Sequence, residues 1–215
     1  MIKFRSIYQF LFATLITVAL VAQFTYGASV GGFTTQYVGL FFSYFTILSN
    51  ILVALVLSAE AFATVRNGAF SKRFEWVRGF SVFCIVATGV TYTFFLRGPG
   101  AMDHIAYALP WANMLFHQII PIVVAIDWIV FPPKNNVRWF SILYWIMLTA
   151  VYAAVVQILG LYTGTYPYFF LDPVRLGSYE RMLHACAAFV PFFLVFGVVI
   201  VLANKICVRF RRRSS

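Results

Sequence analysis

The chain has 215 residues, of which 62% are hydrophobic and only 10% are charged, and its mean hydropathy is +0.88. Apolar runs close to the ~20 residues that cross a bilayer core recur along its whole length. This composition excludes a soluble globular protein and predicts an all-α integral membrane protein with no separate soluble domain. The net charge of +10 is interpreted as a record of membrane topology rather than of nucleic-acid binding.

In chain order, six apolar segments are predicted to cross the membrane as helices. Polar stretches with glycine, proline and charged residues separate them, for example RGPGAMDH and FPPKNNVR. The first segment is too long for the apolar part of a signal peptide, so we expect it to remain as a helix. The chain therefore forms one transmembrane domain, residues 1–215, with spans over residues 7–27, 38–62, 76–96, 111–131, 139–161 and 181–204.

Lysine and arginine predict the orientation of these spans. If the N-terminus is cytoplasmic, thirteen basic residues fall on the cytoplasmic side and three, Arg97, Arg175 and Arg181, fall on the other. Cytoplasmic loops carry the excess of basic residues in membrane proteins. We therefore expect both termini to be cytoplasmic, with the tail CVRFRRRSS against anionic lipid of the inner leaflet.

Ionisable residues within the predicted spans are few. Glu60, Glu75 and Asp127 fall near the cytoplasmic ends of their helices and are interpreted as solvated boundary residues. His117 is different, because it lies about seven residues into its span, roughly 10 Å below the surface at 1.5 Å per residue. An intramembrane histidine is a candidate functional residue, although a core histidine bonded to a neighbouring helix is the alternative.

The surroundings of His117 predict a local disruption of its helix. Asn113 precedes it by four residues and Pro121 follows it by four, so the three share one helix face. Pro121 has no N–H, so the carbonyl of His117 loses its usual partner in the helix. We expect a kink here, with an imidazole on the same face.

A second polar group occurs in the stretch FFSYFTILSN, which begins at Phe41. On one continuous helix, Ser43, Thr46 and Asn50 form a single stripe, with Ser49 at its flank. Helix packing is one explanation, because small hydroxyl residues let membrane helices approach. A chemical role is the other.

The depth of Thr46 favours the chemical role. It lies about eight residues into its span, so its hydroxyl and the His117 imidazole are expected at nearly the same depth, roughly 10–12 Å below the outer surface. A hydroxyl and an imidazole are the minimum parts for nucleophilic acyl transfer. Apolar surroundings favour the neutral imidazole that a general base requires.

Three short elements resemble a known family. YFTILSN (44–50), LFHQIIP (115–121) and YPYFFLDP (166–173) occur in the same order in the androgen-induced membrane hydrolase family, which includes the androgen-dependent regulator of tissue factor pathway inhibitor. The chain is most similar to its six-helix bacterial relatives. The resemblance implies a threonine hydrolase of fatty acid esters of hydroxy fatty acids or related acyl esters, in a bacterial cytoplasmic membrane. It matches the family threonine to Thr46, the family histidine to His117 and the family's acidic position to Asp172, although the last segment here has one extra aromatic residue.

The resulting hypothesis is an intramembrane hydrolase whose substrate is a lipid ester and whose partners are membrane lipids. Thr46 is the nucleophile, and His117 is the general base and then the general acid. The oxyanion of the intermediate needs a hydrogen-bond donor, for which the candidates are Ser43, Asn50 and Asn113.

Two further residues are candidates to orient His117. These are Asp172 and His184, with the alternative that Asp172 only shapes the turn before Pro173. No cofactor is implied, and no metal site, because two membrane histidines without a close carboxylate make a poor zinc site. The three cysteines also lack metal-ligand or disulfide spacing; they are Cys84, Cys186 and Cys207.

Two other classes of function stay open from sequence alone. A b-type haem protein would use His117 and His184 as axial ligands. A small-solute transporter would use the polar stripe as a path, although no paired intramembrane charges and no inverted repeat are evident in the sequence.

Overall fold

The computed structural model describes residues 2–66, 68, 70–97, 108–135 and 137–213. Among these residues the regular structure is entirely helical, and six helices are long and apolar enough to cross a membrane. The predicted all-α integral membrane protein is therefore confirmed. The long helices are α1 (Ile2–Gly31), α3 (Phe45–Val65), α4 (Lys72–Thr91), α7 (Phe140–Thr163) and α9 (Tyr179–Arg213), and the remaining span, Pro110–Val130, consists of α5 (Pro110–Met114), the π-helical turn η3 (Leu115–Ile119) and α6 (Ile120–Val130) in succession. The shorter ones are α2 (Thr35–Ser43) and α8 (Pro173–Leu176), with the π-helical turn η1 (Tyr92–Leu96) and the 3-10 turn η4 (Phe169–Leu171).

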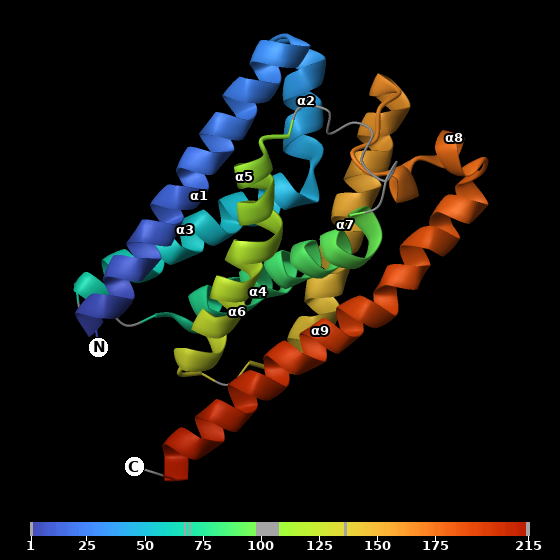
Figure 1. Cartoon of the computed structure of the whole chain (residues 1–215). Coiled ribbons are helices and arrows are strands. Elements are labelled where there is room, and N and C mark those ends of the chain that lie inside the picture. The colour runs from blue at the N-terminus through green and yellow to red at the C-terminus, as the bar shows by residue number, and fades with distance from the viewer. Residues whose placement is uncertain (1, 67, 69, 98–107, 136, 214–215) are drawn as a thin grey trace.

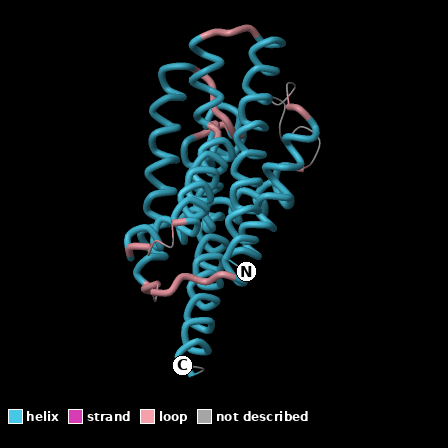
Figure 2. Tube along the Cα trace, turned by 90° about the vertical axis from the view of Figure 1, so that its left-hand side faces the viewer, coloured by secondary structure: helices cyan, strands magenta, loops and turns pink. Residues whose placement is uncertain are grey.

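The helices form an up-and-down bundle (Figures 1 and 2). Both chain termini lie at the same end, which we call the terminal end, as an even number of spans requires; the opposite end is the far end. α1 packs along α3, α3 packs against α4, and α4 also contacts α6, α7 and α9. α3 and α4 are consequently the most buried of the six helices, whereas α7 and α9 are the most exposed.

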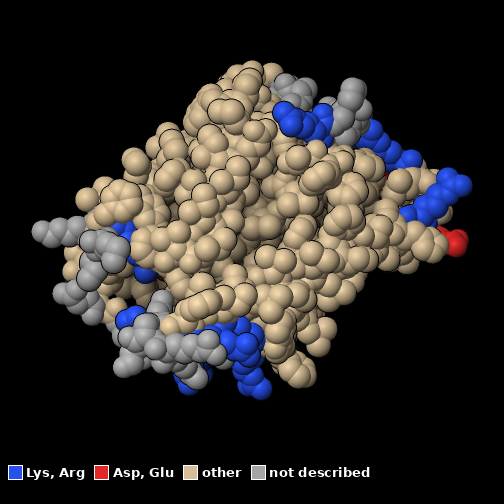
Figure 3. Space-filling view, turned by 60° about the horizontal axis from the view of Figure 1, so that its bottom comes forward, with Lys and Arg blue, Asp and Glu red and all other residues tan. Residues whose placement is uncertain are grey.

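The surface of the bundle is suited to lipid. Large apolar side chains are exposed along α1, α7 and α9, for example Phe10, Val151 and Val195. Figure 3 shows the Lys and Arg side chains at the margins of a surface that is otherwise uncharged over most of its area. This distribution fits a bundle whose middle faces hydrocarbon and whose ends face water.

The segment predicted as one helix over residues 38–62 is two helices. α2 ends at Ser43, Tyr44 is extended with φ −70° and ψ 124°, and α3 begins at Phe45. α2 descends beside α1 from the far end, and nine residues at 1.5 Å each place the start of α3 about 13 Å lower. The single polar stripe predicted for Ser43, Thr46 and Asn50 is therefore wrong, because Ser43 belongs to a different helix.

This break places a helix N-terminus inside the bundle. The first backbone N–H groups of a helix have no partner within it, and they carry a partial positive charge. Thr46 is the second residue of α3, so its own amide is one of these groups. Its carbonyl accepts hydrogen bonds from Ser49 Oγ at 3.1 Å and Asn50 Nδ2 at 2.8 Å, which hold this first turn in place.

The disruption predicted near Pro121 is a π-helical turn. Residues Leu115–Ile119 form η3 between α5 and α6, and the Ile120 N–H bonds to the Leu115 carbonyl one residue further back than in an α-helix. A Cβ placed on Gly89 of α4 would lie 2.8 Å from Pro121 Cβ and 3.1 Å from the His117 carbonyl oxygen. Glycine at this position therefore lets α4 approach η3 closely. The predicted connection RGPGAMDH covers residues 97–104, of which 98–104 lie outside the described residues.

Candidate active site

Thr46 and His117 contact each other directly, although 71 residues separate them in the sequence. Thr46 Oγ1 lies 3.1 Å from His117 Nε2. Thr46 projects from the first turn of α3 and His117 from η3, and their exposed fractions are 7% and 6%. The pair singled out by depth and polarity is thus one hydrogen-bonded unit within the bundle.

The second nitrogen of His117 determines the direction of that hydrogen bond. His117 Nδ1 lies 2.9 Å from the backbone carbonyl oxygen of Asn113, which can only accept. Nδ1 therefore carries the hydrogen, and Nε2 presents a lone pair to Thr46. The Thr46 hydroxyl donates to Nε2, which is the arrangement that a nucleophile and its general base need.

Tyr92 holds the imidazole from its other side. The rings of Tyr92 and His117 are stacked, with centroids 4.0 Å apart and an angle of 23° between their planes. The Asn113 side chain donates from Nδ2 to Tyr92 Oη at 2.6 Å. Asn113 thus fixes both rings, one through its carbonyl and the other through its amide.

Tyr168 is a site residue that the sequence reasoning missed. Its Oη lies 3.3 Å from Thr46 Oγ1 and accepts a hydrogen bond from the Thr46 N–H, also at 3.3 Å. It comes from the extended stretch before η4, where its ring stacks on Phe170 at 5.2 Å and meets Tyr44 edge-on at 5.6 Å. The available signal was the second tyrosine of YPYFFLDP, an aromatic stretch between two membrane helices. Burial raises the pKa of the Tyr168 phenol, so its hydroxyl stays protonated at neutral pH.

A cavity of about 640 Å³ adjoins this group. Thr46 and Tyr168 form part of its wall, and the rest is mostly apolar side chains of α3, α4, α7 and α9. Volumes of 300–1,000 Å³ are typical of small-molecule sites. Ile158, Leu183 and Val190 line the cavity and are also exposed at the surface of α7 and α9, so the cavity reaches the face that meets lipid.

Each of the three predicted oxyanion donors directs a hydrogen bond to another acceptor, and neither asparagine amide, which carries two N–H groups, donates to Thr46 Oγ1. Ser43 Oγ donates to the Leu40 carbonyl at 2.7 Å, within its own helix α2. Asn50 Nδ2 donates to the Thr46 carbonyl, and Asn113 Nδ2 donates to Tyr92. Asn50 and Asn113 thus lie close to the Thr46–His117 pair. Asn50 holds the Thr46 carbonyl, and Asn113 holds the rings of His117 and Tyr92.

The two predicted orienting residues lie away from His117. The Asp172 carboxylate accepts from the Val174 and Arg175 amides at 2.9 and 3.1 Å and caps α8, so it shapes the turn before Pro173. His184 is exposed on α9. The Asn113 carbonyl is instead the group that orients the imidazole.

The alternative haem site is not assembled by the described residues. Both nitrogens of His117 have hydrogen-bond partners within the bundle, whereas His184 is exposed on α9. No group of three or more His, Cys, Asp or Glu side chains that could hold a metal ion occurs in the described part of the chain.

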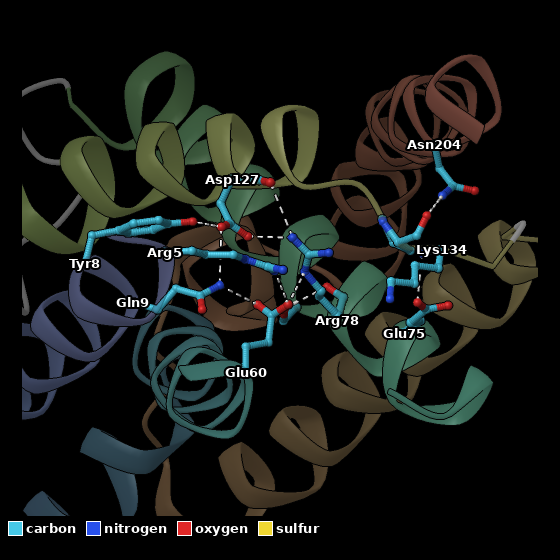
Figure 4. Close-up of polar contacts among 11 residues, drawn as sticks. Arg5, Tyr8, Gln9, Glu60, Glu75, Arg78, Asp127, Lys134 and Asn204 are labelled. Atoms are coloured by element: carbon cyan, nitrogen blue, oxygen red, sulfur yellow. Dashed lines mark hydrogen bonds and ion pairs between the residues drawn. The ribbon is translucent and has the colours of Figure 1, made fainter. Parts of the chain in front are cut away.

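A second polar cluster lies toward the terminal end (Figure 4). Glu60, only 1% exposed, pairs with Arg5 at 2.7 Å and with Arg78 at 3.0 Å. Arg78 also pairs with Asp127 at 2.6 Å, and Tyr8 hydrogen-bonds to the same carboxylate. The interpretation of Glu60 and Asp127 as solvated boundary residues is therefore wrong, because four helices bury them beside arginines.

Glu75 has a separate structural role. Its carboxylate accepts from the backbone amides of Lys134 and Asn135 at 2.9 and 3.0 Å (Figure 4). It is buried, not solvated as predicted, and it fastens the connection between α6 and α7.

Comparison of the chain with family models, curated proteins and solved structures finds no match.

Proposed function

We propose that the protein is an intramembrane hydrolase of lipid esters, with Thr46 as the nucleophile and His117 as the general base. The observation that carries this proposal is the 3.1 Å contact between His117 Nε2 and the Oγ1 atom of Thr46, a residue that lines an apolar cavity. The bond from His117 Nδ1 to the Asn113 carbonyl supports it, because it leaves Nε2 free to take a proton.

The first half of the reaction transfers the acyl group to the protein. Thr46 Oγ1 gives its proton to His117 Nε2 and bonds to the carbonyl carbon of the ester. When the tetrahedral intermediate collapses, the bond from that carbon to the alkoxy oxygen breaks. The imidazolium gives its proton to this oxygen, so the alcohol leaves and an acyl-threonine remains.

The second half returns the enzyme to its starting state. A water molecule gives a proton to Nε2 and attacks the acyl carbon. The bond to Thr46 then breaks, the carboxylic acid is released, and Thr46 Oγ1 regains its proton from the imidazolium. Throughout, the Asn113 carbonyl accepts from Nδ1 and stabilises the imidazolium.

The cavity favours a substrate with a long apolar part. The exposed surface of its wall is almost entirely apolar, so an acyl chain can leave lipid for it without being buried against unpaired polar groups. Because residues of its wall are also exposed between α7 and α9, the proposed route of entry is lateral, from the membrane. With the orientation that lysine and arginine predict, the site lies in the outer half of the bilayer.

The test is hydrolysis of fatty acid esters of hydroxy fatty acids, and of simpler long-chain esters, by the protein purified in detergent. We expect Thr46→Ala to abolish turnover and His117→Ala to lower kcat by about 10²–10⁴. Matched controls are Thr163→Ala and His184→Ala, which remove the same side chains at exposed positions. Wild-type turnover in both site variants would refute the proposal, and so would equal losses in the control variants.

A further inference from the structure

The hydrogen bonds around Thr46 form a chain with a defined direction. Thr46 Oγ1 donates to His117 Nε2, as the position of the Nδ1 hydrogen requires. Tyr168 Oη accepts from the Thr46 amide, so its own hydrogen is available to donate. Thr46 Oγ1 lies 3.3 Å from Tyr168 Oη and can accept this hydrogen. In the resting state the phenol thus donates to the nucleophile, and the nucleophile donates to the base.

From this geometry we infer that Tyr168 is a catalytic residue whose hydroxyl donates a hydrogen bond to the oxyanion of the tetrahedral intermediate. The inference rests on the proposed hydrolase function and adds to it the group that stabilises the developing charge. Tyr168 contacts the reacting oxygen and lines the cavity in which the ester would lie.

Attack on the ester makes the phenol available at the right moment. When Oγ1 bonds to the carbonyl carbon, its proton moves to Nε2, and negative charge develops on the carbonyl oxygen. That oxygen is attached to the same carbon as Oγ1, so it lies next to the hydrogen that Tyr168 had directed at Oγ1. The stronger acceptor takes the hydrogen bond, and no proton needs to leave the phenol.

The backbone of α3 makes Tyr168 a better donor. The Thr46 N–H belongs to the first turn of the helix and donates to Tyr168 Oη, which fixes the phenol. A hydroxyl that accepts one hydrogen bond is also polarised toward donating another. The ring contacts with Phe170 and Tyr44 fix its orientation, and burial leaves the phenol protonated. The donor is therefore organised before the substrate binds.

No other candidate has this position among the described residues. The hydroxyl of Ser43 and the amides of Asn50 and Asn113 donate to other acceptors. Beyond His117, Tyr168 supplies the one side chain within hydrogen-bond distance of Thr46 Oγ1 in the described part of the chain.

The experiment compares Tyr168→Phe with the wild-type protein in the ester assay. Loss of one oxyanion donor predicts that kcat falls by at least about a hundredfold, with KM changed by less than about threefold. The matched control is Tyr37→Phe in α2, which removes a hydroxyl that donates to the Phe24 carbonyl of α1 at 2.7 Å. The control is expected to keep wild-type kcat.

A thionoester, in which sulfur replaces the carbonyl oxygen, separates oxyanion stabilisation from positioning of Thr46. Sulfur is a weak hydrogen-bond acceptor, so the wild-type protein is expected to prefer the oxygen ester strongly, and Tyr168→Phe is expected to lose most of that preference. A variant that loses kcat but keeps the preference would overturn the inference, because Tyr168 would then only position Thr46.

The remaining outcomes separate the inference from the proposed function. If Thr46→Ala is inactive but Tyr168→Phe keeps wild-type kcat, the inference is wrong and the hydrolase proposal stands. If the wild-type protein hydrolyses no ester, both fail. If Tyr168→Phe does not fold, fluorotyrosine at position 168 replaces it, because fluorine lowers the pKa of the phenol and keeps the ring. Its kcat must then fall at alkaline pH while that of the wild-type protein does not, and identical pH profiles would overturn the inference.

Discussion

The bundle buries two polar clusters. Ion pairs between charged side chains satisfy one, and hydrogen bonds between neutral side chains satisfy the other. Toward the terminal end, Arg5, Glu60, Arg78 and Asp127 are charged and satisfy one another through ion pairs across α1, α3, α4 and α6. Farther toward the far end, Thr46, His117 and Tyr168 are linked by hydrogen bonds around the Thr46 hydroxyl oxygen. A polar group in hydrocarbon is costly unless it is paired or faces a cavity.

The cavity distinguishes the two groups. Thr46 and Tyr168 form part of its wall, whereas the four charged residues do not appear along its described lining. The charges are directed toward each other, so their effect is to hold helices together. The Thr46 oxygen is directed toward its base and also faces a space that a substrate can fill. We infer that the ion pairs stabilise the fold, whereas Thr46, His117 and Tyr168 carry out the proposed reaction. Each of the following predictions tests this division of roles.

The largest expected effect is the loss of Arg78. Arg78→Met removes the cation that Glu60 and Asp127 share; Glu60 keeps Arg5, but Asp127 loses its ion-pair partner, and an unpaired buried charge costs about 3–5 kcal/mol. Unfolding in mixed micelles is the measurement, with Arg73→Met, an exposed arginine of the same helix, as the control. The molecules that remain folded are expected to keep the kcat of the wild type. A variant with unchanged stability and lost turnover would contradict the division.

An intermediate effect is expected where α4 meets the site. In Gly89→Ala the new methyl group would lie 2.8 Å from Pro121 Cβ, so α4 and η3 must move apart. Overpacking of this kind costs about 1–3 kcal/mol. Displacement of His117 should also lower kcat by at least about tenfold. The control is Gly39→Ala, where no atom lies within 4 Å of the added carbon, and equal effects in both variants would contradict the explanation.

The smallest expected effect is at Ser49. Its hydroxyl lies 2.9 Å from Thr88 Oγ1 and joins α3 to α4. Hydrogen bonds between membrane helices are worth about 0.6 kcal/mol on average, so Ser49→Ala should lower stability by about that amount. Ser49 also donates to the Thr46 carbonyl, but Asn50 Nδ2 still holds that carbonyl in the variant, so kcat is expected to stay at the wild-type value. Ser29→Ala, at an exposed position of α1, is the control. A kcat loss comparable to that of His117→Ala would place Ser49 in the chemistry.

The six helices, and the disruption near Pro121, could be predicted because length, apolar composition and a missing N–H are local properties. The common depth of Thr46 and His117 could also be anticipated, since helix rise converts sequence position into depth, but their contact depends on how α3 and η3 pack and could not be. The break at Tyr44 could not, because FFSYFTILSN contains neither glycine nor proline. Contacts from residues more than 100 positions away surround it: Tyr152 donates to the Ser43 carbonyl at 2.7 Å, and Tyr168 packs against Tyr44.

The ion pairs were missed for a related reason. Glu60 and Asp127 were interpreted from their places near helix ends, and Arg78 was counted only as a topology residue. Their pairing depends on how α3, α4 and α6 face one another, which the hydrophobic pattern of each helix does not specify. Tyr168 was missed likewise, because its extended segment reaches Thr46 only in the folded bundle.

The most direct test of the central claim is to identify the residue that reacts with a fluorophosphonate, by mass spectrometry of peptides from the labelled protein. If His117 activates the Thr46 oxygen, the phosphonyl group is found on Thr46 in the wild-type protein and is lost in His117→Ala. A wild-type protein that hydrolyses esters yet is labelled at another residue, or a His117→Ala variant labelled at Thr46 as fast as wild type, would contradict it.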